Sequence, residues 1–197
     1  MTERSQRVVL VRHAETEWAL ALRHTGRTDI PLTDHGRRVA AALAGELAEW
    51  RFAAVFASPL DRALETCRLA GLDAAAEPRE ELLEWDYGDY EGLTTSQIRE
   101  QRPDWWLWRD GCPGGEGPAD VGARVDRMIA EVRAVPGDVA VFSHGHCLRV
   151  LGARWVGLEP SAGAMLGLST GAVSVAGYER ETAVLWHWND DRVARAV

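Results

Sequence analysis

Three short, uninterrupted apolar runs in the chain have the length of a buried strand. They are Val8–Val11, Phe52–Ala57 and Val139–Phe142. Runs of this length without polar alternation are typical of strands that are covered on both faces. Two later segments, Ala172–Tyr178 and Ala183–Trp188, are joined by a polar turn and predict a hairpin.

Amphipathic segments separate these runs and predict helices. Apolar residues recur at helical spacing after Thr33, after Ser58-Pro59, from Val121 to Val132 and from Cys147 to Val156. Thr33 and Ser58 suit helix N-caps, and Pro59 suits a first helical position. Strands that alternate with helices predict an α/β fold, a three-layer sandwich whose mainly parallel central sheet is flanked by helices.

Between about residues 82 and 118 the pattern changes to a stretch rich in Trp, Gly, Pro and acidic residues. Only two short helices, at 95–101 and 104–108, are expected there. We interpret the stretch as an excursion or lid over the sheet, inside one domain of residues 1–197. The cluster Trp105-Trp106-Leu107-Trp108 most simply packs this excursion onto the sheet.

Composition narrows the class of protein. A hydrophobic content of 46% and a charged content of 26% are ordinary for a soluble globular protein. The net charge of −8 argues against nucleic acid or an anionic membrane as the main partner. Three cysteines without a CxxC motif and a polar segment Met1–Arg7 without an apolar core favour a reducing, cytoplasmic location.

Two predicted strands end in the same way. Arg12-His13 follows the first, and Ser143-His144 follows the run at 139–142. Ligands of open α/β sheets bind at the carboxyl ends of strands, so the two histidines are expected to face one crevice. Because a neutral imidazole is a good nucleophile toward phosphorus, His13 is the candidate phosphate-attacking residue.

A transferring phosphoryl group needs fixed cations and donors. Arg12 offers one guanidinium fork, and Arg62 offers a second from the first turn of a helix, where the N-terminus also favours an anion. His144, if protonated, would add a third donor.

The leaving alkoxide needs a proton, and Glu84 is the candidate acid. It lies in the Trp- and Tyr-rich segment 82–88, which would desolvate its carboxyl group and keep a proton on it. Asp86, Asp89 and Glu91 are the nearby alternatives.

These residues stand in motifs that resemble the histidine phosphatase superfamily, in its phosphoglycerate-mutase-like branch. The motifs lie at residues 12–16, 25–33, 58–63, 84–92 and 143–146, and they span residues 7 to about 157 in the family's order. The stretch 84–95 is similar to a narrower set, the actinobacterial mutase-like acid phosphatases and sedoheptulose-bisphosphatase-like enzymes.

The resemblance implies a three-layer α/β histidine phosphatase domain and a phosphohistidine intermediate that needs no metal or other cofactor. On that pattern His13 takes the phosphoryl group and Glu84 protonates the leaving group, then activates water. The residues that hold the phosphoryl group are Arg12, Arg62 and His144. The positions at which family members touch substrate, here a small phosphorylated metabolite, are Thr25, Gly26, Tyr87, Gly145 and His146.

The chain also departs from the family pattern. Ala14 replaces the usual glycine after the nucleophile, and Ala19 stands where many members have an asparagine that contacts the phosphoryl group. Thr95 stands where true phosphoglycerate mutases carry a substrate-binding lysine. The missing lysine favours hydrolysis over phosphoryl transfer between positions of a substrate.

Three functions stay open at this point. The favoured one is a metal-independent phosphatase that hydrolyses small organic phosphate monoesters. The second is a phosphoglycerate mutase, and the third is a non-catalytic module that binds a phospho-ligand or a protein. The third conflicts with the presence of His13, Arg62 and Glu84.

Two further hypotheses concern surfaces. The cluster at 105–108 would, as an alternative to packing, wall the pocket and select larger or less charged phosphate esters. The late hairpin would leave an exposed strand edge suited to a homodimer.

Overall fold

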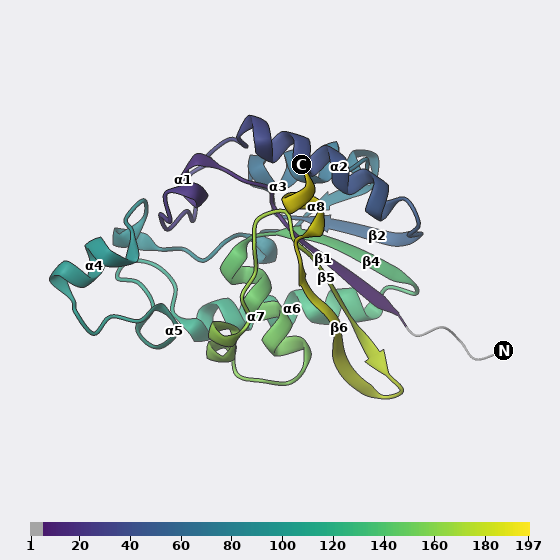
Figure 1. Cartoon of the computed structure of the whole chain (residues 1–197). Helices are drawn as coiled ribbons and strands as arrows, with labels where there is room; N and C mark the ends of the chain where they lie inside the picture. The colour runs from purple at the N-terminus through teal and green to yellow at the C-terminus, as the bar shows by residue number, and fades with distance from the viewer. Residues whose placement is uncertain (1–5) are drawn as a thin grey trace.

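A computed structural model of the chain describes residues 6–197, in which the strands form one six-stranded mixed sheet of order β3-β2-β4-β1-β5-β6 (Figure 1). The strands are Arg7–Arg12 (β1), Phe52–Ala57 (β2), Ala76–Pro78 (β3), Asp138–Ser143 (β4), Val173–Glu179 (β5) and Thr182–Asp190 (β6). The strands β3, β2, β4 and β1 run parallel, and β5 runs antiparallel to both of its neighbours, β1 and β6. The predicted α/β sheet and its late hairpin are confirmed.

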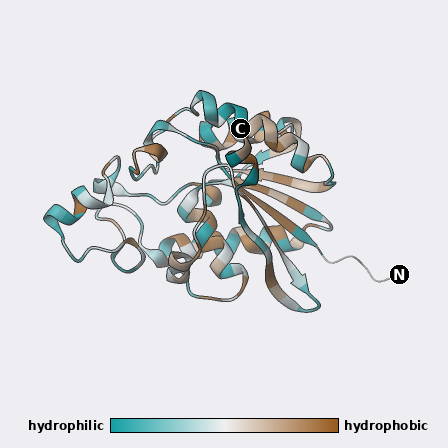
Figure 2. Cartoon of the chain, in the orientation of Figure 1, coloured by the Kyte–Doolittle hydropathy of each residue, from teal (hydrophilic) through white to brown (hydrophobic). Residues whose placement is uncertain are grey.

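Helices cover both faces of the sheet (Figure 1). On one face lie α2 (Asp34–Leu47), α3 (Asp61–Leu69) and α8 (Arg192–Ala196), and on the other lie α6 (Pro118–Ala134) and α7 (Gly145–Trp155). Neighbouring side chains of β1 point to opposite faces, because a strand alternates. Val9 and Val11 therefore join the core under α2, while Val8 and Leu10 join the larger core under α6 and α7. Figure 2 shows this apolar centre.

The helix starts test the capping predictions. Thr33 caps α2 as expected, since its side chain accepts a hydrogen bond from Gly36 N at 2.9 Å. The Ser58 prediction is wrong, because α3 begins at Asp61 after Leu60, which makes no side-chain cap. The Ser58 hydroxyl instead lies 2.7 Å from a ring nitrogen of His144.

The excursion at 82–118 lies beyond the carboxyl ends of β1 and β4 (Figure 1). It contains α4 (Thr95–Gln101), α5 (Leu107–Asp110) and a 3-10 turn at Gly88–Tyr90. Trp105 and Trp108 are buried in the larger core, as the packing interpretation requires, and Trp106 is 45% exposed. The second predicted short helix starts three residues late, at Leu107 instead of Asp104.

Shorter elements that the pattern did not predict complete the chain. They are α1 (Glu17–Leu20) and the 3-10 turns Asp73–Ala75, Glu80–Leu82 and Pro160–Met165. Among residues 6–197, no helix is long and apolar enough to cross a bilayer. Met1–Ser5, part of the polar segment considered above for a targeting signal, lie outside the described residues.

Candidate active site

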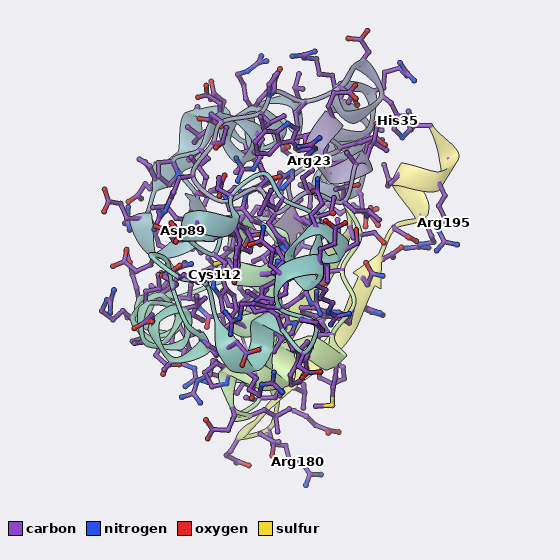
Figure 3. All side chains as sticks on the ribbon, turned by 90° about the vertical axis from the view of Figure 1, so that its left-hand side faces the viewer. Arg23, His35, Asp89, Cys112, Arg180 and Arg195 are labelled. Carbon is purple, nitrogen blue, oxygen red and sulfur yellow. The ribbon has the colours of Figure 1, made fainter. Side chains whose placement is uncertain are left out.

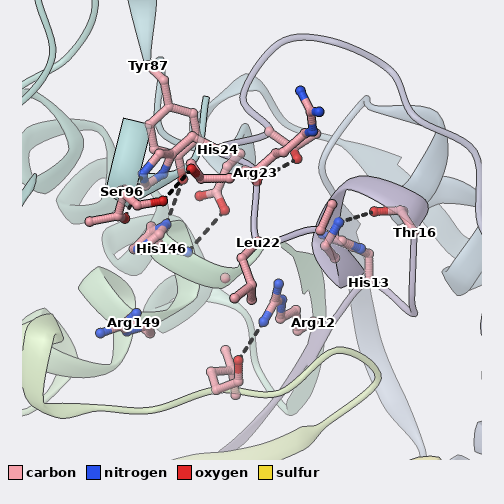
Figure 4. A pocket seen from close by; sticks show the side chains of 18 residues that line it. Arg12, His13, Thr16, Leu22, Arg23, His24, Tyr87, Ser96, His146 and Arg149 are labelled. Atoms are coloured by element: carbon pink, nitrogen blue, oxygen red, sulfur yellow. Dashed lines mark hydrogen bonds between the residues drawn. The ribbon is translucent and has the colours of Figure 1, made fainter. Parts of the chain in front are cut away.

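β1 and β4 end side by side, with Arg12 opposite Ser143 in the register. A cavity of about 620 Å³ opens at this edge. Seven of the ten predicted catalytic and substrate-binding residues line it: Arg12, His13, Thr25, Glu84, Tyr87, Gly145 and His146. Figure 4 shows Arg12 and His13 near one wall and His24, Tyr87 and His146 grouped on another. Figure 3 views the excursion end of the molecule, with the cavity residue Arg23 near the middle.

His13 is held in a single ring orientation. Its backbone N–H donates to Ser143 O at 2.8 Å, and its Nδ1 lies 2.7 Å from Ala14 O. Because a carbonyl oxygen only accepts, Nδ1 carries the hydrogen and Nε2 keeps its lone pair. Burial, together with the charges of Arg12 and Arg62, lowers the pKa of His13 well below its usual value. The ring is therefore neutral and nucleophilic.

Arg12 brings an incompletely satisfied cation to the same cavity. Its Nη1 donates to Leu168 O at 2.6 Å, which fixes the guanidinium. Its Nε has no partner, and within residues 6–197 it is the single buried side-chain nitrogen or oxygen without one. A buried, unpaired charged donor is costly, and an anionic oxygen would satisfy it.

Arg62 lies behind the cavity and holds a loop. Its Nη1 donates to Thr28 O at 2.9 Å, and its Nη2 donates to Gly26 O at 2.8 Å and Thr25 O at 3.1 Å. The side chain is fully buried and does not line the cavity. The donors of Arg62 in this structure therefore go to the loop 25–28 and to the ring of His144.

His144 also lies behind the cavity. Its Nδ1 accepts from Arg62 Nε at 3.2 Å, so its Nε2–H donates to Ser58 Oγ at 2.7 Å. Burial and the charge of Arg62 lower its pKa well below the usual value, so the ring is neutral instead of the protonated donor considered above. Its centroid lies 5.2 Å from that of His13, so it packs against the candidate nucleophile.

Glu84 is placed at the N-terminus of α7. Its carboxyl oxygens accept from Trp85 N at 2.9 Å, Cys147 N at 2.8 Å and His146 N at 3.1 Å. The side chain is buried, as expected for its aromatic segment.

The three alternative carboxylates do not line the cavity. Asp86 pairs with Arg27, Asp89 is exposed, and Glu91 binds the amides of Gly26 and Thr28. Glu84 is therefore the one of the four candidate acids that faces the cavity.

Neutral polar rings form another part of the cavity wall. Tyr87 Oη lies 2.6 Å from His146 Nδ1, and the ring of His24 lies 4.7 Å from that of Tyr87. His24 Nε2 lies 3.3 Å from Thr95 Oγ1. Burial lowers the pKa of His24 to about 4, so its ring is uncharged near neutral pH. These groups exchange hydrogen bonds with uncharged polar atoms.

Sequence reasoning missed several lining residues, among them His24, Arg23, Arg149 and Leu168. The first two directly precede the motif at 25–33, and Arg149 lies about one helical turn after Gly145, so the neighbouring motifs were usable signals. Leu168 carried none, since its carbonyl contacts Arg12 across 156 residues. Within residues 6–197 no group of three or more His, Cys, Asp or Glu side chains is placed to hold a metal ion.

Comparison with known proteins shows the family of the chain. Residues 8–191 match the model of the histidine phosphatase superfamily (branch 1). An acid phosphatase of Mycobacterium tuberculosis is 44% identical over 193 residues, 94% of each chain. Sedoheptulose 1,7-bisphosphatase of Saccharomyces cerevisiae is 35% identical, over 80% of this chain and 70% of its own.

A solved structure shares the fold closely. The product of open reading frame Rv3214 of Mycobacterium tuberculosis superposes with a TM-score of 0.90 at 40% identity, over 95% of this chain and 98% of its own. The family match covers both strand-end histidines and the cavity residues between them. The chain therefore belongs to branch 1 of the histidine phosphatase superfamily.

Proposed function

We propose that the protein is a phosphatase that hydrolyses small organic phosphate monoesters through a phosphohistidine on His13. One observation carries the proposal: His13, with a neutral ring whose Nδ1 is bound to Ala14 O, lines the same cavity as Arg12, whose buried Nε has no partner. A nucleophile and an unsatisfied cationic donor in one cavity suit a phosphoryl group. The phosphatase names of the two relatives agree with it.

In the first step, His13 Nε2 attacks phosphorus and the P–O bond to the alcohol breaks. Arg12 stabilises the charge on the equatorial oxygens, and the leaving alkoxide takes a proton from Glu84. In the second step, Glu84 takes a proton from water, the oxygen attacks phosphorus and the P–N bond breaks. Inorganic phosphate leaves, and His13 and Glu84 regain their starting states. The cations are protein side chains, so the proposal includes no metal.

The uncharged wall of His24, Tyr87 and His146 suits the hydroxyl groups of a small phosphorylated metabolite. Thr95, at the family's mutase lysine position, lies in this cavity as a neutral partner of His24, which supports hydrolysis over the mutase reaction. Buried, unpaired Cys67, Cys112 and Cys147 agree with the proposed reducing, cytoplasmic location.

The test is phosphate release from an aryl phosphate and from 3-phosphoglycerate, with His13→Ala beside the wild type. We expect His13-dependent release from the aryl phosphate, with a loss of at least about 10³-fold in the variant. His35→Ala, a histidine outside the cavity, is the matched control and should keep full activity.

Other outcomes would contradict the proposal. Interconversion of 2- and 3-phosphoglycerate with little phosphate release would identify a mutase. Inactivity toward a broad panel of phosphate esters would identify a binding module. An acid-labile phosphoryl adduct mapped to a residue other than His13 would refute the mechanism.

A further inference from the structure

An ion pair outside the cavity lies directly behind the Glu84 segment. Arg124 of α6 donates from Nε to Glu116 Oε1 at 2.7 Å and from Nη2 to Glu116 Oε2 at 3.1 Å. The two side chains are 9% and 17% exposed. Neither residue lines the cavity, so neither can touch a substrate there.

The pair holds the backbone on both sides of Glu84. Arg124 Nη1 donates to Leu83 O at 2.7 Å and Glu81 O at 2.8 Å, and Nη2 donates to Glu84 O at 3.2 Å. After Glu84, the amide of Asp86 donates to Glu116 Oε2 at 2.8 Å. The backbone of Glu116 also accepts from Trp85 Nε1 at 2.8 Å.

The Glu84 segment needs such support because residues 84–87 belong to no helix or strand. A strand would be fixed by its ladder of backbone hydrogen bonds, whereas here side chains of α6 and of the excursion supply the partners. The Glu84 carboxyl group meets α7 through His146 N and Cys147 N. A shift of its backbone would therefore move the carboxyl group relative to α7 and to His13.

We infer that Arg124 and Glu116 are a positioning pair that sets where the carboxyl group of Glu84 lies in the cavity. The inference rests on the proposed function, in which Glu84 protonates the leaving group. A buried ion pair is weak support for a purely stabilising role, because desolvation offsets much of the attraction. The pair can have a larger effect on the reaction rate by placing a catalytic group, since a displacement of about 1 Å can cost about 10²-fold in rate.

The test uses the dependence on the leaving group. Dinitrophenolate leaves without protonation, whereas phenolate needs a proton more strongly, so a misplaced acid slows phenyl phosphate selectively. In Arg124→Lys, which keeps the charge and loses the fork, kcat/KM should fall about 10- to 100-fold for phenyl phosphate and less than about 3-fold for dinitrophenyl phosphate. We use kcat/KM because it reports only the steps from substrate binding to release of the alcohol, and the later hydrolysis of the phosphohistidine does not affect it.

Two further variants sharpen the result. Glu116→Gln, nearly isosteric, should shift the leaving-group selectivity in the same direction. In a Glu84→Gln background, Arg124→Lys should cause no additional loss of selectivity, because the group that it positions is gone. Asp126→Asn breaks another ion pair of α6, the one between Asp126 and Arg154 of α7. It is the matched control and should leave both substrates unaffected.

An activity-independent measurement separates this inference from the proposed function. The amide NMR signals of His146 and Cys147, which donate to Glu84, should move in Glu84→Gln and also in Arg124→Lys and Glu116→Gln. Unchanged amide signals, or equal losses for both aryl phosphates, would overturn the positioning role. If the wild type showed no His13-dependent hydrolysis, the proposed function would fail. The amide signals would still show whether the Arg124–Glu116 pair positions the carboxyl group of Glu84.

Discussion

At the scale of the residue, the state of the site follows from which atoms donate and which accept. The Ala14 carbonyl places the hydrogen of His13 on Nδ1, and Arg62 places that of His144 on Nε2. Two adjacent imidazoles of similar burial thus differ in what they can do. His13 keeps a free ring nitrogen and lines the cavity, whereas both ring nitrogens of His144 are used in hydrogen bonds to Arg62 and Ser58.

The position of the Arg12 guanidinium depends on the absence of a side chain at Gly145. A Cβ on Gly145 would lie 3.1 Å from Cζ and 3.2 Å from Nε of Arg12, so the guanidinium would have to move by a few tenths of an ångström. We expect Gly145→Ala to lower kcat/KM about tenfold through this displacement. Urea unfolding should show a change in the free energy of unfolding within about 1 kcal/mol.

The matched control is Gly45→Ala in α2, where a Cβ would meet nothing within 4 Å. It should stabilise the protein by about 0.5–1 kcal/mol without changing the rate. Full activity in Gly145→Ala would show that the position of Arg12 does not limit the reaction.

At the scale of the element, the cavity depends on a loop, residues 25–28, that belongs to no helix or strand. Residues 25–28 are held from one side by Arg62, which binds their carbonyls, and from the other by Glu91, which accepts from Gly26 N at 2.9 Å and Thr28 N at 3.1 Å. A cation and an anion thus satisfy opposite groups of one backbone segment. Thr25 reaches the cavity from it.

Removal of one side of this clamp should loosen the loop selectively. In Glu91→Ala we expect amide hydrogen exchange at Gly26 and Thr28 to accelerate about tenfold or more, because each loses a charged acceptor. KM should rise, since Thr25 loses its fixed place. Asp89→Ala removes an exposed carboxylate two residues before Glu91 and should change neither the exchange rates nor KM. Unchanged amide exchange in Glu91→Ala would exclude the clamp.

At the scale of the whole molecule, the buried neutral histidines of the site make the stability of the fold depend on pH. Burial lowers the pKa of His24 to about 4 and lowers that of His13, His144 and His146 well below the usual value. In the unfolded chain these rings take up protons below about pH 6.5. The unfolded state then binds more protons than the folded state, so stability rises with pH in this window and falls as the solution is acidified.

Urea unfolding between pH 8 and pH 4.5 checks this sign. Each imidazole that stays neutral in the folded state should remove up to about 1.4 kcal/mol of unfolding free energy per pH unit below about pH 6.5. His24→Asn should reduce the dependence of the unfolding free energy on pH below about pH 6.5 by the contribution of one imidazole. Above about pH 7.5 it should leave this dependence unchanged. A slope that is unaffected by His24→Asn would contradict the shifted pKa of this ring.

The sequence by itself determined the alternation of strands and helices, the strand-end places of Arg12 and His13 and the resemblance to the family. These features depend on neighbours close along the chain: apolar runs make strands, and a strand carries its last residues to the sheet edge. The register of β1 and β4 then brings the two strand-end histidines together.

Only the tertiary structure decided which polar groups face the cavity and which support it. Ser58 has the sequence of a helix cap, but His144, 86 residues away, takes its hydroxyl. Arg62 has the sequence of an anion-binding helix start, but carbonyls more than 30 residues away take its donors. A hydrogen-bonding group pairs with whatever partner folding brings near it, and the local pattern does not record distant partners. For the same reason, Arg124 and Glu116 have no functional signature in the sequence, although they surround the backbone of Glu84.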